Sequence, residues 1–233
     1  MATFAILNCS LIFGTVCIAI AQQPAKGPEG AAKAGKGKGP TRPALFLREE
    51  WKQTPAGGEH VAVPEETVGN PDLTLDLVGP TGKEMLMTGT AGDENNPIHL
   101  WTGMCTTPCG FALRNKTGFA DLTGLARIRL VSKMSGLHQV HPIVKLADGT
   151  WLVGDRAEGT LADWLESEFN VSELRWLRLD EKRLVTTGNW INNPDLSKVD
   201  EIGFADLMPS SGHGPGGWAD IGKVEVFAKS VAR

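Results

Sequence analysis

Short segments in which apolar and polar residues alternate recur throughout residues 44–233, separated by turns rich in glycine, proline and aspartate. The alternation is plainest in Leu73–Leu77, where polar residues separate three leucines, and it returns in Arg127–Leu130 and Lys223–Val226. Successive side chains of a β-strand point to opposite faces, so this period predicts strands with one buried and one solvated face. A chain with this pattern is expected to build antiparallel sheets.

A β-hairpin is predicted at Ile143–Val153, where two such segments flank Asp148-Gly149. An Asp-Gly pair readily adopts the positive φ values of a tight two-residue turn. The remaining segments with strand character are Ala44–Glu49, Glu84–Thr88, Phe111–Arg114, Leu174–Leu179, Arg183–Thr187 and Val199–Phe204. Helical spacing occurs at Leu161–Phe169, where a single short turn or helix is expected.

Ten or so short strands with almost no helix predict an all-β domain, an antiparallel β-sandwich or jelly roll. Residues 44–233 are numerous enough for one domain with a substantial core. They contain 18 basic and 26 acidic residues, a net charge of −8. Nucleic acid is therefore not expected as a partner, because phosphate binding needs a concentrated cationic face.

The first 43 residues differ from the rest of the chain. The stretch Phe4–Ala21 is almost wholly apolar and closes on small residues, which predicts a secretory signal at residues 1–21, although no Lys or Arg precedes it. A transmembrane anchor is the alternative, because about 18 apolar residues approach bilayer-spanning length. Residues 22–43, rich in Gly, Pro, Ala and Lys, are predicted to be a flexible tether.

With the signal removed, the mature protein is expected to be periplasmic or extracellular, with no further transmembrane segment. The mature chain would keep Cys105 and Cys109, in Cys-Thr-Thr-Pro-Cys, and these are predicted to form a disulfide across a tight loop. A zinc site with His99 and His213 as further ligands is the alternative, but zinc sites more often combine two paired clusters. A redox role is disfavoured because the spacing is C-x-x-x-C and no βαβ context surrounds it.

The second half of the chain carries a particular order of motifs. Asp121-Leu122-Thr123-Gly124 precedes a strand, Trp176 falls within another, the stretch 194–204 (PDLSKVDEIGF) leads into a third, and Ile221–Phe227 is a late alternating strand. Over about residues 119–229 this order resembles the galactose-binding-like β-sandwiches, particularly carbohydrate-binding modules and the complex I intermediate-associated protein family. Lys145–Val153 also resembles a type of secreted protein of environmental bacteria, which implies no function.

The resemblance to these sandwiches implies a non-catalytic domain that binds carbohydrate or another cell-envelope ligand. It transfers no ligand residue, because sugar contacts in such sandwiches lie in variable loops. Such folds often hold a structural calcium ion through loop carboxylates and carbonyls, but nothing in this sequence singles out a calcium site, and no other cofactor is expected.

The chain has seven tryptophans and no tyrosine. An indole exposed on a loop is a stacking platform for the apolar face of a sugar ring, and Trp190 and Trp218 are the best candidates, with Trp101 also near a turn signal. The Gly-rich stretch 210–218 adds His213 as a hydrogen-bonding group. For each tryptophan the alternative is a role in filling the core.

No motif identifies an enzyme. Hydrolysis of glycosides needs two carboxyl groups about 5–10 Å apart, and no spacing distinguishes a pair. The candidate carboxylates are Asp121, Asp155, Glu158, Asp163, Glu166, Glu168, Asp206 and Asp220. The sequence has no Gly-x-Ser-x-Gly, His-Glu-x-x-His or P-loop, and His138-x-x-His141 would need a loop or a bulge to chelate.

Three functions therefore remain open. The first is a carbohydrate-binding sandwich, the second is a glycan hydrolase with a carboxylate pair, and the third is an envelope domain that contacts other proteins. Burial of both Trp190 and Trp218 would favour the third.

Overall fold

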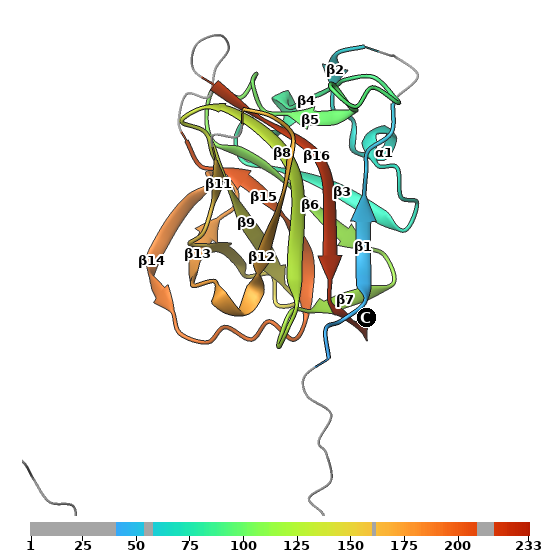
Figure 1. Ribbon diagram of the computed structural model, residues 1–233. Coiled ribbons are helices and arrows are strands. Elements are labelled where there is room, and N and C mark those ends of the chain that lie inside the picture. The colour runs from blue at the N-terminus through green and yellow to red at the C-terminus, as the bar shows by residue number, and fades with distance from the viewer. Residues whose placement is uncertain (1–40, 54–57, 160–161, 209–216) are drawn as a thin grey trace, which may run out of the picture. The chain divides into compact units, whose positions relative to one another are not determined.

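The computed structural model describes residues 41–53, 58–159, 162–208 and 217–233. These residues build two antiparallel β-sheets that lie face to face, with β12, β8, β16 and β1 in front of the second sheet in Figure 1. The predicted all-β antiparallel sandwich is confirmed. The predicted signal at residues 1–21, residues 22–40 of the predicted tether, and His213 lie outside the described residues.

The first sheet has seven strands and centres on β16, which pairs with β8 along one edge and with β5 and then β1 along the other. Its strands, in spatial order, are β12 (Leu165–Asn170), β8 (Arg127–Gly136), β16 (Gly217–Phe227), β5 (His99–Trp101), β4 (Leu86–Thr88) and β2 (His60–Val61), with β1 (Leu45–Glu49) beside β16.

The second sheet has ten strands, and β15 lies at its centre between β9 and β6. Its main path is β14 (Val185–Ile191), β13 (Trp176–Asp180), β10 (Trp151–Gly154), β9 (Gln139–Leu146), β15 (Val199–Asp206), β6 (Cys109–Asn115) and β3 (Leu73–Val78). Three short strands attach to this path: β11 (Glu158–Gly159), β7 (Gly118–Asp121) and β17 (Lys229–Ala232). The helical elements are α1 (Pro64–Thr67) and the 3-10 turns η1 (Gly82–Glu84) and η2 (Val171–Glu173).

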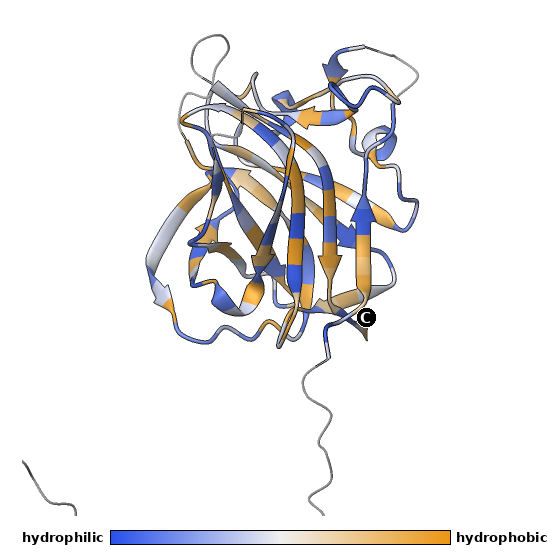
Figure 2. Ribbon diagram, viewed as in Figure 1, coloured by the Kyte–Doolittle hydropathy of each residue, from blue (hydrophilic) through white to orange (hydrophobic). Residues whose placement is uncertain are grey.

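The alternating side chains of the two sheets meet in one core. Figure 2 shows apolar and polar residues alternating along β8 and β16. The fully buried members include Leu100, Leu113, Ile128, Leu130, Val144, Leu152, Val224 and Val226. Trp51 closes the space between the sheets, because its Nε1 donates to the carbonyl of Ile221 at 2.7 Å and its ring meets Phe111 edge-on. Burial of such apolar area is the main stabilising term of a sandwich.

Two local predictions were wrong. The Ile143–Val153 hairpin forms, but its predicted two-residue turn does not. The N–H of Leu146 donates to the carbonyl of Thr150 at 2.8 Å, so three residues close the loop, and only the last, Gly149, has a positive φ, of 86°. The segment predicted as helix forms β12, which pairs with β8 over six residues. Pairing with the open edge of β8 overrides a weak local helical preference, as tertiary context commonly does.

Part of the outer face of the ten-stranded sheet is itself covered. A second apolar cluster occupies it, formed by Val78, Ala112, Ile143, Trp151, Val153, Leu179, Leu184 and Ala205. The N–H of Gly79, after β3, donates to the carbonyl of Glu181, after β13, at 3.1 Å. The sheet therefore curls until its two sides meet, and this region is core rather than ligand surface. No helix within the described residues is long and apolar enough to cross a bilayer.

Candidate functional site

Aromatic and charged side chains gather on the outer face of the seven-stranded sheet, where β5 and β16 pair. Trp101 lies directly opposite Asp220, and Trp218 precedes Asp220 by two residues on β16. Leu100 and Ala219, which alternate with these residues, are fully buried in the core. Trp101, Trp218 and Asp220 therefore share the solvent side of the sheet.

Asp220 is the centre of this cluster and is only 7% exposed. The Nε1 of Trp218 donates to its Oδ2 at 3.3 Å, and the Nε2 of His99 lies 3.5 Å from its Oδ1. Lys133 of β8 lies directly opposite Asp220 across the sheet. Burial raises the pKa of Asp220 to about 6, against the opposing effects of the Trp218 hydrogen bond and the Lys133 charge.

His99 is held as a neutral hydrogen-bond acceptor toward Asp220. Its Nδ1 is 2.7 Å from the carbonyl of Pro97, which can only accept, so Nδ1 carries the proton and Nε2 presents a lone pair. Burial, together with the charge of Lys133, lowers the pKa of His99. Trp164 covers the other side of the imidazole edge-on, with ring centroids 5.1 Å apart.

Hydrogen bonds of Thr102, just before the loop that the disulfide closes, fix the backbone next to Trp101. Thr102 accepts from the N–H of Ala219 through Oγ1 at 2.9 Å, and its own N–H donates to the Ala219 carbonyl at 3.0 Å. Cys105 and Cys109 are bonded, with Cα atoms 6.2 Å apart and no exposed surface, so the predicted disulfide is confirmed.

The Trp101 ring lies directly over Gly103. A Cβ at that position would come within 2.2 Å of the ring atom Cζ2, closer than any real contact. Glycine is therefore required for the indole to lie flat on this loop.

A pocket of about 340 Å³ adjoins Trp218. It combines the indole with an ammonium group, a hydroxyl and small residues, and it is lined by Lys133, Met134, Ser135, Gly136, Ala162 and Trp218. Trp218 lies opposite Ser135 on β8, and Gly217, with a φ of 105°, starts β16 where a Cβ would lie 2.4 Å from the Ser135 carbonyl. The pocket thus offers one stacking surface with hydrogen-bonding groups beside it.

The other half of this outer face is closed by ion pairs. Arg129 contacts Glu168 at 2.7 Å and Arg127 contacts the same carboxylate at 3.1 Å. The guanidinium carbon of Arg127 lies 3.9 Å above the ring of Phe227. Arg129 also lies 3.9 Å from Glu225 of β16, so these ion pairs link β12, β8 and β16 across the face.

The structure brings together only part of the predicted set of ligand residues. Trp101 and Trp218 share one face of the seven-stranded sheet near Asp220, whereas Trp190 lies on β14, at the edge of the ten-stranded sheet. Trp190 is 43% exposed, and the Arg175 guanidinium carbon lies 4.5 Å above its ring. His213 lies outside the described residues, so its place in the site stays a prediction.

Sequence reasoning missed the central role of Asp220 and the contributions of His99, Lys133 and Trp164. Asp220 was one of eight carboxylates without a distinguishing spacing, and His99 was considered only as a zinc ligand. The signal that could have helped is the alternation in Trp218-Ala219-Asp220, which places an indole and a carboxylate on one face.

No metal centre is found where the sequence alternatives placed one. The disulfide uses both cysteines of the zinc alternative. Nδ1 of His138 is 2.5 Å from Oδ2 of Asp206 in the interior, while Nδ1 of His141 is 3.0 Å from the carbonyl of Gly154, so the two histidines do not chelate together. Within the described parts of the chain, no three His, Cys, Asp or Glu side chains are grouped to hold a metal ion.

Solved structures with a similar fold include carbohydrate-binding proteins. The family 11 carbohydrate-binding module of a Clostridium thermocellum cellulosomal cellulase is 14% identical with a TM-score of 0.40, covering 74% of this chain and 95% of that one. A family 11 module from the same organism, in complex with a β-1,3-1,4-mixed-linked tetrasaccharide, is 15% identical with a TM-score of 0.40, covering 73% and 96%.

An exo-β-agarase is 10% identical with a TM-score of 0.38, covering 76% of this chain and 25% of that one. No protein-family model matches the chain, and no curated protein matches it. At these identities and TM-scores the likenesses assign neither a ligand nor a residue role.

Proposed function

We propose that this chain is a non-catalytic carbohydrate-binding domain of an exported protein, with its binding surface on the outer face of the seven-stranded sheet. The observation that carries the proposal is that Asp220 has Trp101 beside it on β5 and accepts a hydrogen bond from Trp218 of its own strand, next to the pocket that Lys133 lines. Sugars present apolar C–H faces and hydroxyl edges, and this surface matches both features.

Each group has a distinct part in the proposed contact. The indole of Trp218 stacks against a pyranose ring at the pocket wall. The carboxylate of Asp220 accepts hydrogen bonds from hydroxyl groups, and the ammonium of Lys133 donates to a hydroxyl or ring oxygen. His99 lies beside the carboxylate and Trp164 packs against His99, and both contacts limit the access of water to Asp220.

The pockets favour binding over hydrolysis. Among the pockets on the described part of the domain are five of about 330 to 360 Å³, and none of these five is lined by two carboxylates. Acid and base catalysis on a glycoside requires such a pair. Trp190 and Trp218 both keep exposed surface, so the condition that favoured a purely protein-binding role is not met.

Export is supported by the disulfide, since such bonds persist in oxidising compartments. Determining the amino-terminal sequence of the mature protein tests whether the chain is exported and its signal cleaved. A terminus at Gln22 fits signal cleavage, whereas an intact Met1 in a membrane fraction fits the retained anchor.

A glycan array followed by titration calorimetry tests the binding function. Trp218→Ala is expected to weaken binding to the selected glycan about ten-fold or more, because it removes the stacking surface. Trp190→Ala, which removes the exposed indole of the other sheet, is the matched control and is expected to leave the affinity unchanged. The opposite pattern would move the site to β14, and no binding across a broad array would refute the function.

A further inference from the structure

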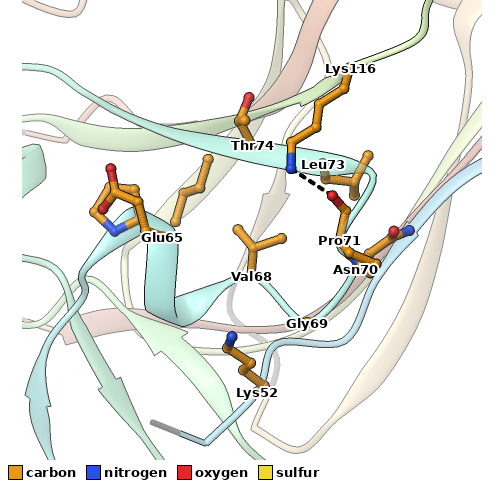
Figure 3. Close-up of a pocket in the computed structure, with 11 residues that line it drawn as sticks. Lys52, Glu65, Val68, Gly69, Asn70, Pro71, Leu73, Thr74 and Lys116 are labelled. Atoms are coloured by element: carbon orange, nitrogen blue, oxygen red, sulfur yellow. Dashed lines mark hydrogen bonds between the residues drawn. The ribbon is translucent and has the colours of Figure 1, made fainter.

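A separate pocket of about 360 Å³ lies on the far side of the edge strand β3 from its partner β6. Its walls are α1, the segment 68–71 and the first half of β3, and Val68 and Leu73 lie at its apolar floor (Figure 3). Leu75 also lines the pocket. Neither Trp101 nor Trp218 lines it. Its volume is at the small end of the range for ligand sites.

The walls of this pocket are fixed by a buried carboxylate. Glu49 has no exposed surface, and its Oε1 accepts from the N–H groups of Trp51 at 2.8 Å and Gly69 at 2.7 Å. Its Oε2 accepts from the N–H of Asn70 at 3.1 Å. The segment 68–71 is therefore held against β1 without a ligand, and the pocket is already formed.

Two lysines reach this pocket from opposite walls. The N–H of Lys52 is bonded to the carbonyl of Thr67 at 3.1 Å, and the N–H of Lys116 to the carbonyl of Asp72 at 2.9 Å. The Nζ of Lys116 donates to the carbonyl of Pro71 at 2.6 Å, which holds the ammonium at the rim (Figure 3).

The charge of this pocket contrasts with that of the domain. Lys52 and Lys116 face one carboxylate of the lining, that of Glu65, which extends from the α1 wall (Figure 3). The lining is thus net cationic, while residues 44–233 carry a net charge of −8. β3 is the last strand of its sheet, so its free edge also turns backbone groups toward this side.

We propose that this pocket binds a small organic carboxylate whose apolar body rests on Val68, Leu73 and Leu75 and whose carboxyl group is attracted by the positive charges of Lys52 and Lys116 at the two walls. Two ammonium groups above an apolar floor complement a molecule with one anionic end and one apolar ring. This site is distinct from the Trp218 surface and does not depend on the carbohydrate-binding proposal.

Titration calorimetry of the full chain at low salt tests the proposal, with cyclohexanecarboxylate and glucuronate as probes. Cyclohexanecarboxamide and glucose are their uncharged counterparts. At least one carboxylate is expected to bind, and its uncharged counterpart is expected to bind at least ten-fold more weakly. Equal binding of acid and neutral probe, or no binding of either acid, would overturn the proposal.

Matched variants locate the binding. Lys52→Met and Lys116→Met are each expected to weaken carboxylate binding about ten-fold, while Lys83→Met, an equal loss of charge on η1 outside the pocket, leaves it unchanged. Lys116→Arg keeps the cation and is expected to retain binding, which separates loss of charge from loss of fold. If Trp218→Ala abolishes carboxylate binding instead, the acid binds at the other surface and this proposal fails.

Discussion

The carboxylate of Asp220 is withdrawn from water by the aromatic residues around it. Trp218 supplies one hydrogen bond, and the nearest group on the other side is the unprotonated Nε2 of His99, which cannot donate to an ionised carboxylate. The charged form of Asp220 is therefore poorly compensated in the free protein. Binding groups are often held at such a cost in stability, since the ligand supplies the missing hydrogen bonds.

Asp220→Asn is expected to stabilise the fold above pH 7. The pKa of Asp220 is raised from 3.8 to about 6 in the folded state, so the folded state binds more protons than the unfolded state between these values. The wild-type protein accordingly gains stability as pH falls through this window and lacks that gain above it. Denaturant unfolding should show the variant more stable at pH 8 by an amount on the order of 2–3 kcal/mol.

That difference should shrink toward zero below pH 4, where the aspartic acid is neutral in both states. Asn keeps an oxygen that accepts from the Nε1 of Trp218, so the hydrogen bond is preserved. An Asn variant that is less stable than wild type at pH 8 would show that ionised Asp220 has stabilising partners.

At the scale of elements, β16 connects the core, the site and the disulfide loop. Its inner residues pack in the sandwich, its outer residues form part of the proposed binding surface, and its backbone at Ala219 exchanges two hydrogen bonds with Thr102. The loop between Thr102 and Cys109 is thereby attached to the strand that carries Trp218. Changes in this loop should therefore alter the geometry of the site.

Replacing Cys105 and Cys109 together by serine is expected to cost about 2 kcal/mol of unfolding free energy. The five-residue loop is short, so the entropic contribution of the crosslink is small. Because both cysteines are fully buried in the core, the added hydroxyls can only increase this loss. Glycan affinity should fall as Trp101 loses its fixed loop, and calorimetry on the oxidised and reduced wild-type protein measures the same effect.

Glu49→Ala is expected to destabilise the domain by roughly 3 kcal/mol or more, because it leaves three buried or partly buried backbone N–H groups without their acceptor. Glu50→Ala, the neighbouring exposed residue, is the control and should change stability by less than about 0.5 kcal/mol. Thermal unfolding of the two variants decides this. Equal melting temperatures would mean that the segment 68–71 finds other partners.

At the scale of the described domain, the two sheets have different outer faces. The ten-stranded sheet buries much of its outer face under a second apolar cluster. The outer face of the seven-stranded sheet presents aromatic side chains next to a group of ion pairs. The pocket near β3 lies at an edge between them and is cationic in an acidic domain. Each surface thus matches a different ligand chemistry.

A chain that begins at residue 41 is expected to unfold at the same temperature as one that begins at residue 22. The first described strand, β1, starts at Leu45, and the carbonyl of Ala44 already bonds the N–H of Ala228. Residues 22–40 carry no large apolar side chain that could add to the core. Calorimetric scans of the two chains test this, and a lower midpoint for the shorter chain would show that the predicted tether packs on the domain.

The alternation of apolar and polar residues was sufficient to predict strands and a sandwich at Leu73–Leu77, Arg127–Leu130 and Lys223–Val226. Alternate side chains of a strand point to opposite faces, and this holds whichever strand it pairs with. The close spacing of Cys105 and Cys109 was sufficient to predict their bond for a similar reason, since both ends of the contact lie in one short loop. These are local properties, and they survive any tertiary arrangement that buries the apolar face.

Contacts between distant segments were decided only by the tertiary structure. The register of β5 against β16 places Trp101 opposite Asp220. The local sequence around these two residues does not predict that they pair. The open edge of β8 turned the segment at 165–170 from an expected helix into a strand. Pairing partners, register and burial depend on the whole chain at once, so no single segment of the sequence predicts the site that they form.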